Sequence, residues 1–208
     1  MNMSQRTFEI EIEGISPLIQ NNPQKSNLTR DLKPNKTRNN SPLDPQEEWR
    51  CLVYTIGEDG TLGHPSEAME MCLREAGKEI KGTGRRTLAT PIKRTCFLEG
   101  EYMTLTNRKL DDCFPKRMAP RNSAGQTTPY YAPEFAAGWR MKFQIHVMDD
   151  DAITPSALKR VLDKAGEAIG LGVHRPKYGR FMVVGFQEIE ISTMKSDMGL
   201  PPAHLAAD

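Results

Sequence analysis

Residues 157–183 read ALKRVLDKAGEAIGLGVHRPKYGRFMV and decide much of the fold, because a helix pattern, a glycine-rich loop and a strand pattern follow one another directly. Thr154 is placed to cap the helix, with Pro155 in its first turn. After the loop, Phe181 begins the apolar face of a strand whose opposite face holds Phe186. The apolar stripe has the spacing of an amphipathic helix and consists of Ala157, Leu158, Val161, Leu162, Ala165 and Ile169.

Periodicity in the rest of the chain predicts four more elements of the core. Residues 8–12 and 139–147 alternate apolar with polar side chains, as half-buried strands do. The segment 64–80 has helical spacing, and His64 stands where a helix cap is expected. A further strand is expected at 90–100.

In chain order these elements run strand, helix, strand, strand, helix, strand. This is the ferredoxin-like or RRM-like βαββαβ arrangement of an α+β protein. Two large insertions are expected, at about 14–64 and 100–138. The first contains a polar, proline-rich segment at 20–47, a candidate binding arm, and a short strand at 49–56, whereas residues 101–138 are expected to be irregular. We expect a single domain over residues 1–208.

The composition is that of an ordinary soluble protein. Of 208 residues, 38% are hydrophobic and 26% are charged, and no apolar run is long enough to span a membrane. The N-terminal residues lack the apolar region of a signal peptide. The four cysteines form no CxxC pair, which argues against a zinc knuckle or a redox pair and favours reduced thiols. We expect a cytoplasmic protein without membrane contact, in the bacterial host cytoplasm if a phage encodes it.

Charge is distributed unevenly, although the net charge is only +1. Segregated charge gives a protein a positive face despite a neutral sum, and such a face attracts nucleic acid. Chance clustering on a solvated surface is the alternative. Outside the quoted loop, the basic residues predicted to contact nucleic acid are Lys25, Arg30, Lys33, Lys36, Arg38, Arg85, Arg86, Lys116, Arg117 and Arg121.

The loop between the second helix and the last strand is the strongest candidate site. Its glycines permit positive φ or close approach, and backbone N–H groups after a helix can meet an anion. Its cations add charge that suits a sugar-phosphate backbone. A plain connection with solvated cations is the alternative. The loop residues predicted to bind nucleic acid are Gly170, Gly172, His174, Arg175, Lys177, Tyr178 and Arg180.

Aromatic residues in the second insertion are candidates for stacking on bases, which single-strand-binding proteins use without reading sequence. Tyr130 and Tyr131 lie in the stretch 127–133, which has no helix or strand periodicity, so we expect both to be accessible. Trp49, Phe135 and Trp139 are further stacking candidates, and for Phe135 and Trp139 burial in the core is the alternative.

The helix, the glycine-rich loop ending in KYGRF (177–181) and the closing strand resemble the C-terminal signature of the RAMP superfamily, which contains the Cas5, Cas6 and Cas7 proteins of CRISPR ribonucleoproteins. FEIEIEGISPLI (8–19) resembles the family's opening strand and turn. The same stretches are similar to uncharacterised phage and prophage proteins. The resemblance implies a Cas7-like protein: an RRM-like core with thumb-like insertions that polymerises along guide RNA.

Catalysis is expected to be absent. Because the superfamily includes RNA endonucleases, His174 is a weak candidate for a general base at a ribose 2′-OH; a phosphate contact is the alternative. Asp31 and Asp44, candidates by analogy with RNA-cleaving Cas7-type subunits, have no motif around them. The acidic runs lack the spacing of metal ligands. We predict no metal and no cofactor.

The sequence therefore predicts a single-stranded nucleic-acid-binding protein, with a Cas7-like, RNA-binding backbone subunit as the first interpretation. Its partners would be single-stranded RNA or DNA, further copies of itself in an oligomer or filament, and other ribonucleoprotein subunits. Three alternatives remain open: a phage single-stranded DNA-binding or recombination protein, a metal-independent RNA endonuclease, and an assembly protein that binds no nucleic acid.

Overall fold

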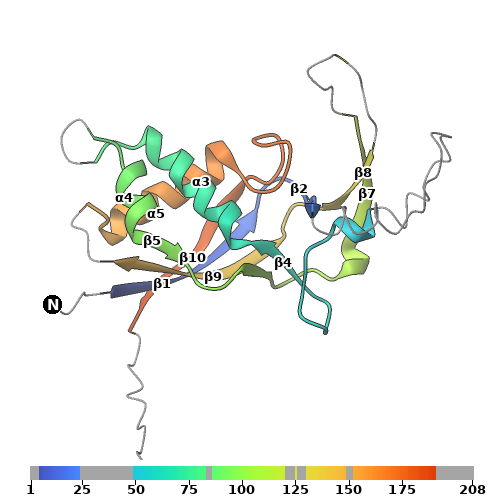
Figure 1. The fold of residues 1–208 in the computed structure, drawn as a ribbon, viewed down its shortest axis with the longest axis horizontal. Coiled ribbons are helices and arrows are strands. Elements are labelled where there is room, and N and C mark those ends of the chain that lie inside the picture. The colour runs from blue at the N-terminus through green and yellow to red at the C-terminus, as the bar shows by residue number, and fades with distance from the viewer. Residues whose placement is uncertain are drawn as a thin grey trace, which may run out of the picture.

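The fold was determined as a computed structural model, which describes residues 5–23, 49–82, 86–119, 125, 130–148 and 152–190. Its main feature is a seven-stranded antiparallel sheet with helices packed on one face (Figure 1). The strands are hydrogen-bonded in the order β10-β1-β9-β6-β4-β3, and β5 also pairs with β9. Their bounds are β1 Gln5–Gly14, β3 Thr55–Ile56, β4 Thr61–Pro65, β5 Cys96–Leu98, β6 Tyr102–Leu105, β9 Arg140–Met148 and β10 Phe181–Ile189.

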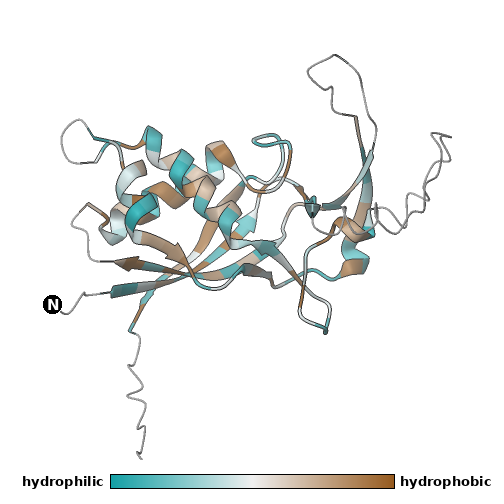
Figure 2. Cartoon of the chain, viewed as in Figure 1, coloured by the Kyte–Doolittle hydropathy of each residue, from teal (hydrophilic) through white to brown (hydrophobic). Residues whose placement is uncertain are grey.

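Three α-helices cover one face of this sheet: α3 (Ser66–Glu79), α4 (Ala89–Thr95) and α5 (Pro155–Lys164). A π-helical turn, Ala165–Ile169, extends α5. The hydrophobic core lies between the helices and the sheet, and hydrophilic and hydrophobic residues alternate along the helices that enclose it (Figure 2). The architecture is therefore α+β, with a large antiparallel sheet.

A second, three-stranded sheet projects to one side of the main sheet (Figure 1). It consists of β2 (Leu18–Ile19), β8 (Tyr130–Phe135) and β7 (Cys113–Met118), in that order. Because β2 follows β1 closely and β8 leads into β9, this small sheet grows directly out of the two central strands. Two short 3-10 turns, Arg50–Leu52 and Leu110–Asp112, complete the described elements.

The strongly periodic elements are confirmed. In β1 the side chains of Phe8, Ile10 and Ile12 are fully buried, as their alternation predicts. The helix α5 begins where expected, because the Thr154 hydroxyl accepts a hydrogen bond from the Ala157 N–H at 3.1 Å.

Three segments differ from the prediction. The expected strand at 90–100 is the helix α4 followed by the short strand β5. The spacing of its buried residues explains this, since Leu88, Ile92 and Cys96 lie four apart. The expected strand at 49–56 is a 3-10 turn with only Thr55–Ile56 in β conformation.

The segment 101–138, expected to be irregular, contains β6, β7 and β8. The β7–β8 hairpin was not predicted because the segment contains prolines. Proline cannot donate a hydrogen bond to the ladder of a sheet and therefore argues against a strand. In the structure Pro115 and Pro133 lie directly opposite each other, so the two missing donors fall at one step of the ladder.

The prediction for Phe186 was wrong. The pairing of β1 with β10 shifts between Glu11 and Ile12, which leaves an extra residue in β10 near Gly185. This bulge turns Phe186 towards the core, where its ring lies 5.3 Å from that of Phe8. Met182 and Val184 stay exposed.

The close packing of the π-helical turn on β10 can be tested at Gly166. A Cβ atom at this position would collide with the backbone carbonyl of Phe181. We expect Gly166→Ala to lower the free energy of unfolding by about 1–3 kcal/mol, as overpacking does. Urea denaturation measures this, with Glu167→Ala at the neighbouring exposed position as the control, expected to change stability by no more than about 0.5 kcal/mol. Equal stabilities of the two variants would contradict the packing described.

Candidate nucleic-acid interface

The glycine-rich loop is held against β2 by backbone hydrogen bonds. The N–H of Val173 donates to the Ile19 carbonyl at 3.0 Å, and the N–H of Gly179 donates to the Pro17 carbonyl at 2.8 Å. Within the loop, the Leu171 N–H donates to the Gly179 carbonyl at 2.9 Å. Leu171 is fully buried in the main core. The loop is therefore a docked part of the fold, and its tip, residues 174–177, is exposed.

The glycines are required by this docking. Gly172 and Gly179 have φ of +73° and +75°, and a Cβ atom would collide with the carbonyl of Ile19 at the first and of Leu171 at the second. The prediction of positive φ and close approach is confirmed. The expectation of free N–H groups was wrong for Gly170 and Gly179, because the Gly170 N–H donates to the Ala165 carbonyl at 2.8 Å and that of Gly179 to Pro17.

The loop presents three cations without carboxylate partners. Arg175, Lys177 and Arg180 are exposed, and no carboxylate among the described residues forms an ion pair with any of them. The Lys177 ammonium lies 5.6 Å from the centre of the Tyr178 ring, a cation–π distance. An anion approaching this loop would meet charge that is not already neutralised within the described structure.

The small sheet brings Tyr130 to the same place. Its hydroxyl lies 3.4 Å from Nε2 of His174 in the loop. The rings of Tyr130 and Tyr178 and the side chain of Val173 pack around a small apolar cluster formed by Ile19, Met118 and Ala132. Segments that are far apart in the sequence thus form one surface, which we call the loop surface: His174, Arg175, Lys177, Tyr178 and Tyr130.

Lys116 lies beside the loop surface but is neutralised. Its Nζ is 3.2 Å from an Oε atom of Glu134 on the neighbouring strand. The hydrogen bond and charge of Glu134, and then the nearby Tyr178, raise the pKa of Lys116. Arg117 and Tyr131 lie opposite each other on the other face of the hairpin, and Tyr131 packs against the main core.

The helix-free face of the main sheet carries paired charges. Lys142 of β9 lies 2.9 Å from Glu9, and Arg140 lies 2.6 Å from Glu13, both across the β1–β9 ladder. The acids of β1 thus stand next to the cations of β9. This face offers nucleic acid little uncompensated positive charge.

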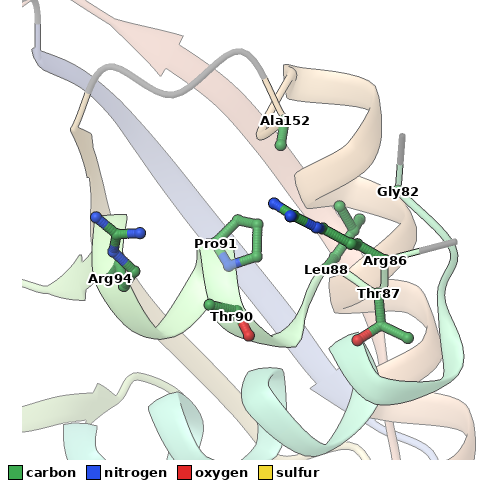
Figure 3. Close-up of a pocket in the computed structure, with 8 residues that line it drawn as sticks. All are labelled: Gly82, Arg86, Thr87, Leu88, Thr90, Pro91, Arg94 and Ala152. Atoms are coloured by element: carbon green, nitrogen blue, oxygen red, sulfur yellow. The ribbon is translucent and has the colours of Figure 1, made fainter. Parts of the chain in front are cut away.

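Arg86 belongs to a different part of the molecule. It lines a cavity of about 780 Å³ together with Arg94 on α4, and the two side chains lie on either side of Pro91 (Figure 3). The remaining predicted contact residues lie outside the described residues: Lys25, Arg30, Lys33, Lys36, Arg38, Arg85 and Arg121. The proposed binding arm at 20–47 is likewise described only as far as Pro23.

The other three stacking candidates are structural. Phe135 and Trp139 are fully buried, so the core alternative holds for both, and Trp49 is only 4% exposed. The Trp139 indole N–H donates to the Ser16 carbonyl at 2.8 Å, which fixes the chain just before β2.

Sequence reasoning missed the role of His64. It was expected to cap a helix, yet it lies in β4, is 3% exposed, and precedes Pro65, the residue at the N-cap position of α3. Burial, with a contribution from the charge of Arg175, lowers the pKa of His64 to about 4. Nothing in the local sequence marks this histidine, since the loop that covers it comes more than a hundred residues later.

No group of three or more His, Cys, Asp or Glu side chains that could hold a metal ion occurs among the residues described. Within the same part of the chain, no helix is both long and apolar enough to cross a bilayer. No disulfide joins any of the four cysteines, and burial raises the pKa of Cys72 to about 12.

Comparison with known proteins gives a likeness of fold. No family model matches the chain, and no curated protein matches it. Among solved structures, the chain is similar to one in "Cryo-EM structure of the Type III-B Cmr-beta bound to cognate target RNA", with a TM-score of 0.56 and 10% sequence identity. The match covers 89% of this chain and 61% of that chain. The two chains therefore share a distant likeness of fold.

The burial of His64 should make stability depend on pH. Well above pH 6.5, His64 is neutral in both the folded and the unfolded state, so its burial does not reduce the free energy of unfolding through protonation. As pH falls towards 4, the unfolded chain takes up a proton that the folded protein excludes, and the free energy of unfolding falls by about 3 kcal/mol from this group. Urea denaturation measures this. Between pH 7 and pH 4, the free energy of unfolding should fall by about 3 kcal/mol more in the wild type than in His64→Phe. Equal losses in the two proteins would contradict this.

Proposed function

We propose that this protein binds single-stranded nucleic acid along its sugar-phosphate backbone, as a RAMP-type, Cas7-like RNA-binding subunit that oligomerises on the strand. One observation carries the proposal: the cations of the loop surface have no carboxylate partner among the described residues, whereas the sheet-face cations Arg140 and Lys142 do. Strand binding by phosphate contact requires free positive charge, because its free energy comes largely from released counterions.

The neighbouring aromatic rings suit the same ligand. Tyr130 and Tyr178 are partly exposed, belong to the same loop surface as Arg175 and Lys177, and are held in place by the apolar cluster under them. A ring fixed by packing loses little conformational entropy when a base stacks on it. Charge for the backbone and partly exposed rings for the bases therefore lie on one surface.

The topology supports a ferredoxin-like core within the larger sheet. The elements β1, α3, β5, β9, α5 and β10 follow one another as strand, helix, strand, strand, helix, strand, and their strands lie in the order β10-β1-β9-β5. In this assignment β3, β4 and β6 extend the sheet, and the β7–β8 hairpin is the insertion that meets the loop surface. The likeness to a chain from an RNA-bound Cmr complex favours RNA over DNA as the ligand.

The proposal is for binding without catalysis. His174 is the nearest group able to act as a base, and its Nε2 already faces the Tyr130 hydroxyl. A phage single-stranded DNA-binding protein would use the same loop surface, so the choice of strand is part of the test.

The test is fluorescence anisotropy with labelled single-stranded RNA and DNA at several salt concentrations. We expect Arg175→Gln/Lys177→Gln to weaken RNA binding and to reduce the slope of log K against log salt by about 1.4, since each phosphate contact contributes about 0.7. The matched control is Arg140→Gln/Lys142→Gln, which removes the same charge from the sheet face and should leave the slope nearly unchanged. RNA should bind more tightly than DNA.

Failure of the folded wild type to bind either strand would refute the proposal and leave an assembly protein. Equal losses in the two double variants would show that net charge, and not the loop surface, governs binding. Cleavage of the RNA that survives EDTA and disappears in His174→Ala would replace the proposal by the endonuclease alternative.

A further inference from the structure

A small cavity opens beside the loop surface, between the loop and the junction of β4 with α3. Its volume is about 140 Å³, compared with about 30 Å³ per molecule in liquid water, so it has room for a group of a few heavy atoms. It is lined by Asn21, Tyr54, His64, Pro65, Ala68, Met71, Gly172, Val173 and Arg175. None of these residues carries a carboxylate.

The tautomer of His64 follows from its neighbour Gln20. The Gln20 side-chain oxygen accepts a hydrogen bond from the Tyr54 N–H at 3.0 Å, so the amide nitrogen must point the other way, where it donates to the Gly63 carbonyl at 2.7 Å. This same nitrogen lies 3.4 Å from Nδ1 of His64. A donor facing Nδ1 leaves the ring proton on Nε2.

His64 Nε2 therefore carries an N–H that has no acceptor among the residues the structure describes. The atom is buried and makes no hydrogen bond with any of them. A buried donor without an acceptor costs about 1–3 kcal/mol. Gln20 faces Nδ1, and His64 is one of the residues that line the cavity, so Nε2 is the ring nitrogen left to bind a ligand there.

Two further features make this cavity favourable for an anion. Arg175 lines it, and its charge is close enough to act on both His64 and Cys72. The α3 helix begins at Ser66, and Ala68 of its first turn lines the cavity, so the positive end of the helix dipole lies here. The acid in that turn, Glu67, lines a different hollow.

We propose that this cavity is a binding site for one phosphate group of the bound strand, which would accept hydrogen bonds from Nε2 of His64 and from the Arg175 guanidinium. The inference rests on the proposed function and deepens it. Arg175 would bind one phosphate directly in the cavity, whereas Lys177, which does not line the cavity, would attract the strand only through its charge.

The experiment follows the ring nitrogens of His64 by NMR of the full chain labelled with ¹⁵N-histidine, with His64→Phe used to assign the signal among the four histidines. The probes are inorganic phosphate, added at constant ionic strength, and single-stranded RNA. We expect the Nε2–H signal to move saturably with both. Arg175→Gln should raise the half-saturating phosphate concentration at least tenfold, since a hydrogen bond to a charged group contributes about 1.5–3 kcal/mol. Lys177→Gln should leave it nearly unchanged.

The outcomes separate this inference from the proposed function. Salt-dependent RNA binding without movement of the His64 signal would overturn the phosphate site and leave the proposed function standing. A signal that moves with phosphate but not with RNA would also overturn it, since the site would then take free anions and not the strand. Equal effects of Arg175→Gln and Lys177→Gln on phosphate binding would show general charge attraction and overturn it as well.

Discussion

The row of backbone hydrogen bonds between residues 171–180 and residues 15–19 is the interaction on which the candidate site depends. It joins the segment before the last strand of the main sheet to the segment that starts the small sheet, with the Arg180 carbonyl accepting from the Ile15 N–H at 2.9 Å. The Arg180 N–H in turn donates to the Ser16 hydroxyl at 2.9 Å. Without this docking, the loop cations would have no fixed relation to Tyr130 or to His64.

The docking explains residue choices on both sides of it. Gly14 leaves space for the Trp139 indole, whose N–H holds the Ser16 carbonyl. Gly172 and Gly179 lie where any side chain would push the loop off its partner carbonyls. Gly-rich loops are commonly assigned to phosphate binding through their N–H groups. Here the N–H groups of Gly170 and Gly179 hold the loop together, and contact with a ligand falls to its side chains.

Local periodicity was enough to predict β1, α3, β9 and α5, because each of these has one face buried along most of its length. It failed where the outcome depends on partners elsewhere in the chain. The β7–β8 hairpin is defined by cross-strand pairing that its prolines obscure, and the bulge near Gly185 that buries Phe186 is a property of the β1–β10 register. Short elements of this kind carry too few residues for a period to emerge.

The same limit applies to charge. Nothing local in the sequence shows that Arg140, Lys142 and Lys116 are paired, because their carboxylate partners are distant in the chain and adjacent only across a ladder. Exposed ion pairs of this kind contribute little to stability. Their larger effect is on the charge offered to a ligand, since they neutralise cations of the helix-free face, whereas the loop cations form no ion pair among the described residues.

His64 shows how a binding site can be recognised from a buried donor that the fold alone leaves without an acceptor. Proteins rarely bury a hydrogen-bond donor without an acceptor, because the donor then loses its hydrogen bond to water and gains none within the protein. Here the donor lies beside Arg175 and the start of α3, two features that both favour negative charge. Apolar side chains packed into the cavity would leave this donor without an acceptor, and the chain keeps an open space there. A group that brings negative oxygen atoms into that space satisfies all three features at once, and phosphate is the part of a nucleic acid that does so at every residue of the strand, whatever its sequence.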